Sequence, residues 1–147
     1  SQAMATTISL ARKVTAAGHC MHIYPEGLFS SRLSRGRIGA VQFALALDLP
    51  IVPVGFSGMN LLFPRKKMVP CKRGVLAMRF GKPYRIDPAR FKGFTPFSPD
   101  DEIGFKDALE DETHQLMNRI NALLDEECSW GTDRAGDGFK GVARFFE

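Results

Sequence analysis

The apolar positions of the chain fall into runs whose length and spacing predict helices and strands. A first helix is expected to begin at Thr6 or Thr7, to carry apolar residues at helical spacing and to end at Gly18. The short apolar run at residues 20–24 is bounded by turn residues and predicts a buried strand. The run at residues 38–49 is apolar on nearly all sides, which is typical of a helix buried on more than one side.

Two more strands and a last helix complete the pattern. Residues 50–56 form a continuous apolar run, as in a parallel strand covered on both faces, although Pro53 cannot donate a ladder hydrogen bond and favours an edge or a bulge. Residues 75–80 predict a third strand. Ser98, followed by proline and three acids, is a strong helix start, and an apolar stripe continues to about residue 128. This order predicts an α/β fold with a partial, mostly parallel sheet and flanking helices.

The chain divides into three parts. Residues 1–3 are interpreted as a cloning remnant before Met4, and residues 4–128 as one domain. Residues 129–147 form a glycine-rich C-terminal tail. The tail is expected to fold back onto the domain through its aromatic residues, Trp130, Phe139, Phe145 and Phe146.

Composition and charge narrow the class of protein without choosing a ligand. The 147 residues suffice for one hydrophobic core, and a net charge of +4 is compatible with anionic ligands, an anionic membrane surface or nucleic acid. The three cysteines, Cys20, Cys71 and Cys128, lie far apart without zinc-site spacing, which favours free thiols in a reducing cytoplasm. No apolar run reaches the roughly 18 residues of a spanning helix, so we expect a protein that is soluble or bound to a membrane surface.

The segment between the first expected strand and the buried helix, YPEGLFSSRLSRG at residues 24–36, carries the candidate chemistry. Pro25 stiffens the exit from the strand, and Gly27 permits a backbone angle that other residues avoid. Between them stands Glu26, which we interpret as a clamp on an arginine or a partner for an acceptor hydroxyl. Side chains that can donate hydrogen bonds to a phosphate follow at Ser30, Ser31, Arg32, Arg35 and Arg37. The alternative is a solvated basic turn in which Glu26 pairs with an arginine.

Other signatures are weaker. The sequence GFSGM at residues 55–59 lacks the final glycine of a nucleophile elbow, and no P-loop or dinucleotide-binding glycine motif occurs. His19, Cys20 and His22 are close in sequence, but on a strand His19 points away from the other two. No metal site and no bound cofactor are therefore expected.

Three segments together resemble the glycerophospholipid acyltransferase family, which includes the 1-acyl-glycerol-3-phosphate acyltransferases. They read IYPEGLFS at residues 23–30, IVPVGFSG at residues 51–58 and FGKPYRID at residues 80–87. The match covers roughly residues 18–58, with the third segment similar to the family's next strand and its exit. The resemblance implies transfer of a fatty acyl group from an acyl-CoA or acyl-carrier-protein co-substrate to lysophosphatidate or a related glycerol-phosphate acceptor.

The resemblance also implies roles for particular residues. Pro25, Glu26, Gly27 and Ser30 match the family's phosphate-site motif, and Pro53 matches the proline of a later motif that helps to shape the acyl or acceptor pocket. Leu28 and Phe29 stand where the family has threonine and arginine. Arg32 and Arg35 are therefore the candidates to replace the displaced arginine.

The family's general base is a histidine in an H-x-x-x-x-D motif, and this sequence contains no such motif. Tyr24, Gly27 and Arg119 stand five positions after the three histidines. The chain thus resembles the C-terminal part of an acyltransferase, and no catalytic residue is assigned. The rival interpretation is a non-catalytic module that binds phosphate or an acyl thioester. A basic nucleic-acid-binding domain is a third and weaker interpretation, because exposed aromatic residues interleaved with the basic ones and a recognised binding module are lacking, so no nucleic-acid partner is expected.

The segment MNLLFPRKK at residues 59–67 sets apolar residues beside three cations, which suits an anionic bilayer interface. The alternative is a surface loop whose apolar residues reach the core. These observations favour a cytoplasmic protein that binds peripherally to the inner membrane face. Apolar surface left bare on the sheet or on the 38–49 helix would favour self-association.

We expect the chain alone to transfer no acyl group from acyl-CoA to lysophosphatidate above the uncatalysed rate. A positioned general base contributes roughly 10²- to 10⁴-fold, and none is identified. Product formation followed by chromatography tests this. Turnover that His19→Ala or His22→Ala abolishes would contradict it.

Overall fold

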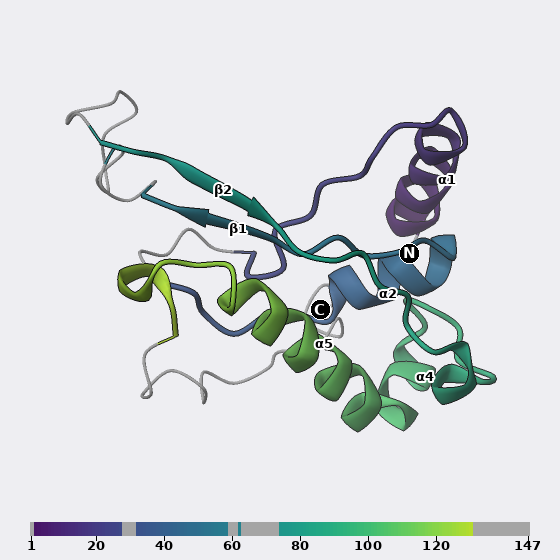
Figure 1. Ribbon diagram of the computed structural model, residues 1–147. Coiled ribbons are helices and arrows are strands. Elements are labelled where there is room, and N and C mark those ends of the chain that lie inside the picture. The colour runs from purple at the N-terminus through teal and green to yellow at the C-terminus, as the bar shows by residue number, and fades with distance from the viewer. Residues whose placement is uncertain (1, 28–31, 59–61, 63–73, 131–147) are drawn as a thin grey trace.

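The computed structural model describes residues 2–27, 32–58, 62 and 74–130, and Figure 1 shows their arrangement. The helices and strands of these ranges are, in chain order, α1 (Gln2–Ala16), α2 (Gly39–Leu47), β1 (Val54–Ser57), β2 (Ala77–Phe80), η1 (Pro88–Phe91), α4 (Pro99–Gly104), α5 (Lys106–Asn121) and η2 (Glu126–Cys128). The chain thus combines helices with a small sheet.

Helix α2 forms within the run at residues 38–49, as predicted, and is buried at Val41 and Gln42, while its other residues are partly buried. Its residue Val41 is fully buried, and the preceding Ile38 is nearly so. These two side chains form one core cluster with Leu109 of α5 and with Ile86 and Phe91 of the η1 region. Burial of each such side chain contributes about 1.5–3 kcal/mol. The helix therefore joins α5 to the segment that follows β2.

A buried polar contact ties α2 to the turn before α4. Gln42 is fully buried, and its side-chain amide donates to Glu102 over 3.3 Å. The amide oxygen of Gln42 accepts a hydrogen bond from the backbone N–H of Phe97, a residue with a positive φ of 65°. Phe97 also packs edge-on against Phe43 of α2. One glutamine in an otherwise apolar helix thus positions the start of α4.

The sheet differs from the prediction. Within the described residues it has two strands, and β1 pairs with β2 in antiparallel register, with Val54 opposite Phe80 and Ser57 opposite Ala77. The expected mostly parallel sheet is not found there. Residues 20–24, expected as a strand, have no strand assignment and approach β1 through a side chain, the ring of His22 stacking on Phe56 at 6.2 Å. Side-chain contact with β1 thus replaces a hydrogen-bonded ladder.

Pro53 lies at an irregular end of the hairpin, as expected for a residue without an N–H group. Its carbonyl accepts a hydrogen bond from Gly81 over 2.8 Å. Beyond it, Ile51 and Tyr84 form an isolated bridge through two backbone hydrogen bonds of 2.8 and 2.9 Å. Between this bridge and the Val54–Phe80 pair, the strand after β2 contains one residue more than its partner, which defines a bulge.

The helical predictions at the two ends of the chain were correct in type and wrong in extent. α1 begins at Gln2, and Thr7 lies inside it, where its hydroxyl donates to the carbonyl of Ala3. Ser98 caps α4, with Pro99 in the first turn, but the helix ends at Gly104 and α5 starts separately. No described helix is both long enough and apolar enough to cross a membrane.

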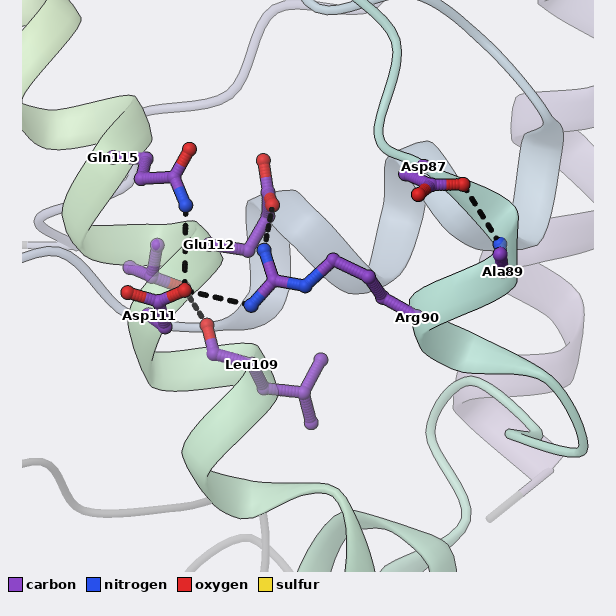
Figure 2. Close-up of polar contacts among 8 residues, drawn as sticks. Asp87, Ala89, Arg90, Leu109, Asp111, Glu112 and Gln115 are labelled. Atoms are coloured by element: carbon purple, nitrogen blue, oxygen red, sulfur yellow. Dashed lines mark hydrogen bonds and ion pairs between the residues drawn. The ribbon is translucent and has the colours of Figure 1, made fainter.

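An ion-pair cluster connects η1 to α5 (Figure 2). Arg90 donates to Asp111 over 2.6 Å and to Glu112 over 3.1 Å. The Glu112 side chain is 6% exposed, whereas that of Arg90 is 37% exposed. Burial raises the pKa of Glu112, and the neighbouring Arg90 opposes that shift. The hydrogen bond from Arg90 lowers the pKa of Asp111. Arg90 therefore compensates a carboxylate whose ionised form burial disfavours.

Arg90→Ala is expected to lower the free energy of unfolding at pH 7 by about 1–3 kcal/mol, because it leaves a buried acceptor without its donor. Glu112→Gln removes the buried charge and is expected to change stability by less than about 1 kcal/mol. Because the pKa of Glu112 is higher in the folded state, its folded form binds a proton more readily. The stability of the unmodified chain relative to Glu112→Gln is therefore expected to rise as pH falls from neutrality towards the ordinary value of 4.5. Urea unfolding at several pH values measures this difference, and a relative fall would contradict the assignment.

Candidate phosphate-binding site

The two ends of the candidate loop at residues 24–37 are hydrogen-bonded to each other, and we call this junction the neck. One carboxylate oxygen of Glu26 accepts hydrogen bonds from both the backbone N–H and the hydroxyl of Ser34, each over 2.7 Å. Beside this contact, the backbone N–H of Arg37 donates to the carbonyl of Pro25 over 2.8 Å. These bonds join the two ends of the loop. Charge-assisted bonds of this length are among the stronger ones in proteins.

Gly27 allows the chain to turn at the neck. Its φ is 62°, in the left-handed region that favours glycine, and its N–H donates to the carbonyl of Tyr24. A Cβ atom at this position would lie 3.1 Å from the guanidinium Nε of Arg37. The absence of a side chain therefore lets Arg37 approach the backbone that follows Glu26. The sequence interpretation of Gly27 as a conformational requirement is confirmed.

The three arginines of the loop lie in different surroundings. Arg32 is exposed and follows the part of the loop outside the described residues. Arg37 lies against Gly27 at the neck. Arg35 points to α5, where its guanidinium lies 3.6 Å from a carboxylate oxygen of Glu110. Arg32 and Arg37 thus differ from Arg35, which lies beside a carboxylate of α5.

Glu26 has a different partner from the one that its sequence context suggested. In the ion pairs of the described residues it takes no part, and both of its hydrogen bonds come from Ser34. Sequence reasoning missed Ser34 as a site residue. A signal for it exists in the spacing, because a carboxylate and a hydroxyl eight residues apart flank a glycine-containing turn and can close a loop.

Several expected site residues are not brought to this neck. Pro53 lies in the hairpin, where its ring packs near Gly81. Ser30, together with Leu28 and Phe29, lies outside the described residues. The same holds for the 59–67 segment except Leu62, and for the tail from residue 131 onwards. Trp130, the one described aromatic residue of the tail, packs against the core cluster of α5 as expected.

A separate pocket of about 340 Å³ lies between the 35–38 segment and α5. Its lining combines Arg35 with three carboxylates of α5, those of Asp107, Glu110 and Asp111. Their spacing along the sequence puts them on one helix face, a signal that sequence reasoning did not use. Three carboxylates around one arginine disfavour a phosphate there. The acidic lining of this pocket thus further distinguishes the surroundings of Arg35 from those of the other two arginines.

Two of the three histidines make aromatic contacts. His22 packs against Tyr24 with ring centroids 4.6 Å apart, and His114 packs edge-on against Trp130 at 5.5 Å. In the described ranges, no three His, Cys, Asp or Glu side chains are grouped so as to hold a metal ion.

Comparisons with models of protein families, with curated proteins and with solved structures find no match to this chain.

Glu26→Ala is expected to open the neck. Removing the acceptor of two charge-assisted hydrogen bonds should lower the free energy of unfolding by about 1.5–3 kcal/mol, and the Ser34 amide should lose protection against hydrogen exchange. Ser34→Ala removes only the hydroxyl bond and should cost less. Glu127→Ala, at an exposed carboxylate, is the matched control. Equal exchange rates at Ser34 in the Glu26→Ala and control chains would show that Glu26 does not close the loop.

Proposed function

We propose that residues 24–37 bind the phosphate of lysophosphatidate or a related glycerol-phosphate acceptor, in a protein of the acyltransferase kind that its motifs resemble. The observation that carries this proposal is the closed neck, in which Glu26 holds Ser34 by two bonds of 2.7 Å. A closed neck holds the two ends of the loop together before a ligand arrives, so less binding energy is lost to bringing them together. The backbone and hydroxyl donors and the arginines of the loop are the groups that phosphate recognition uses.

The surroundings of the three arginines favour different roles for them within the proposal. Arg32 is exposed, and Arg37 adjoins Gly27 at the neck, so both are suited to reach an anion held by the loop. Arg35 is directed to Glu110, and its neighbours in the pocket are anionic. Of the two arginines that the sequence suggested as replacements, Arg32 is therefore the better candidate. Ser30 completes the motif in this proposal, and Pro53 acts at a distance from the phosphate.

The reaction within this proposal is acyl transfer from acyl-CoA or an acyl-carrier protein to the acceptor hydroxyl. In this chain the loop supplies binding and orientation of the acceptor, and no described residue is assigned as general base. A lysophosphatidate acceptor is held in a bilayer, so the proposal includes peripheral contact with an anionic membrane at its cytoplasmic face. The second candidate function is phosphate or thioester binding without chemistry. It is favoured by the aromatic packing of His22 and His114.

Calorimetric titration with glycerol 3-phosphate separates the arginines. Arg32→Ala and Arg37→Ala are each expected to weaken binding about tenfold or more, because a partly desolvated charge-assisted contact contributes roughly 1.5–3 kcal/mol. Arg35→Ala is the matched control and is expected to weaken binding less than about fivefold, as for a screened surface charge. Negligible losses of affinity at all three positions would mean that the loop is only a solvated basic turn. A largest loss at Arg35 would move the anion site to the α5 pocket.

A second titration, with a non-hydrolysable acyl-CoA analogue, distinguishes acceptor binding from thioester binding. Glu26→Gln is expected to weaken glycerol 3-phosphate binding and to leave analogue binding within about twofold, because the altered neck lies at the phosphate end of the proposed site. Equal losses of affinity for both ligands would mean that Glu26→Gln weakens binding by destabilising the whole fold.

A further inference from the structure

The two faces of the β1–β2 hairpin differ in their surroundings. On one face, Arg79 donates to the carbonyl of Leu123 over 3.1 Å and pairs with Asp125 at 2.8 Å. On the same face, the hydroxyl of Ser57 accepts a hydrogen bond from the backbone N–H of Asp125, and Gly55 lies close to Leu123. The segment after α5 therefore covers this face.

The opposite face is apolar and open on the β2 side. Side chains alternate along strands, so Val54 and Phe56 share this face with Met78 and Phe80 of β2. His22 stacks on Phe56, which covers part of β1. Met78 is 50% exposed and Phe80 66% exposed. The preceding residues, Val75 and Leu76, are exposed as well. Apolar exposure is thus concentrated along β2, which lies on the outer side of the hairpin in Figure 1.

The backbone of β2 offers a free edge beside these side chains. The Gly81 N–H donates to Pro53, so residues 81, 79 and 77 direct their backbone groups towards β1. The N–H and C=O groups of Met78 and Phe80 consequently point away from β1. In the described part of the chain the sheet ends at β2. An edge with unpaired backbone groups and exposed apolar side chains is a template for another strand.

We propose that the outer edge of β2 pairs with β2 of a second copy of this chain, in antiparallel register about a two-fold axis at Met78. In this register Met78 lies opposite the second copy's Met78, and Leu76 opposite the second copy's Phe80. Ala77 then lies opposite the second copy's Arg79. The two hairpins form one four-stranded sheet with a continuous apolar face.

Charge and side-chain pairing favour this register over one centred on Arg79. Moving the axis by one residue, to Arg79, would set two arginines directly opposite each other, which is destabilising. The axis at Met78 instead pairs apolar residues with one another across the new ladder. A two-fold interface is self-complementary and closed, so association stops at the dimer.

A strand satisfies this edge better than a lipid surface does. Bilayer hydrocarbon covers apolar side chains but leaves backbone N–H and C=O groups without partners. A short edge buries less than the roughly 800 Å² per partner of a standard interface, so the dimer is expected to be weak and concentration-dependent.

Sedimentation velocity over a range of concentrations tests the association. The unmodified chain is expected to shift from monomer to dimer as concentration rises, and Met78→Lys to weaken dimerisation at least about tenfold, because charged residues at an edge oppose strand pairing. Ile103→Lys on α4 is the matched control, since it makes the same change at a side chain that is 77% exposed. A monomer at every concentration, or equal effects of the two substitutions, would overturn the proposal.

Cysteine cross-linking tests the register in a chain with Cys20 and Cys71 changed to serine. Met78→Cys is expected to form a disulfide-linked dimer under mild oxidation, because directly opposite residues of a hydrogen-bonded pair have Cα atoms about 5.5 Å apart. Leu76→Cys is the control on the same edge, and the proposed register separates its two copies by about 13 Å along the strand direction. Cross-linking at position 76 and not at 78 would overturn the register. Loss of binding to anionic vesicles by Met78→Lys, with self-association unchanged, would identify a lipid surface instead.

Discussion

The contact between Gly36 and Met117 is the constraint on which the arrangement of the candidate site depends. A Cβ atom at Gly36 would lie 2.6 Å from both Cγ and Sδ of Met117, closer than side chains allow. The backbone after the loop therefore lies directly on α5, between the buried residues Leu33 and Ile38. Because packed interiors tolerate little added volume, this contact fixes the backbone positions of the arginines on either side of Gly36. Arg35 is thereby brought to α5, while Arg37 reaches back to the neck.

The same helix organises the rest of the chain. Its buried stripe joins both core clusters, through Leu109 to α2 and through Leu116 and Ile120 to the 33–38 segment. The residues just after α5 cover one face of the hairpin through polar contacts with Ser57 and Arg79. α5 therefore positions the loop, the central helix and the sheet together. The apolar face of β2 is left over because α5 and its C-terminal segment cover only one side of the hairpin.

Most of the ion pairs of the described residues also involve α5 or the segment that follows it. Acidic side chains of α5 are matched by Arg35 and Arg90, each from a different segment packed against that helix. Arg79 is likewise engaged with Asp125. Arg32 and Arg37 take part in none of the ion pairs of the described residues. Both of these arginines lie at the loop whose neck Glu26 closes, and their lack of an ion-pair partner in these ranges supports the proposed anionic ligand for that loop.

By itself, the sequence determined those features that depend on local chemistry. Ser98 and Pro99 start a helix, Gly27 takes a left-handed conformation, Pro53 lies at a bulge, and the apolar run around Val41 forms a helix. Each follows from the conformational limits or the burial of a few neighbouring residues. Tertiary structure alone decided how these elements pair. Strand direction depends on which backbone groups meet, and an apolar run does not encode that, so the expected parallel sheet gave way to an antiparallel hairpin. In the same way, the loop contains a glutamate, several hydroxyls and three arginines, and only packing on α5 determined which of them meet.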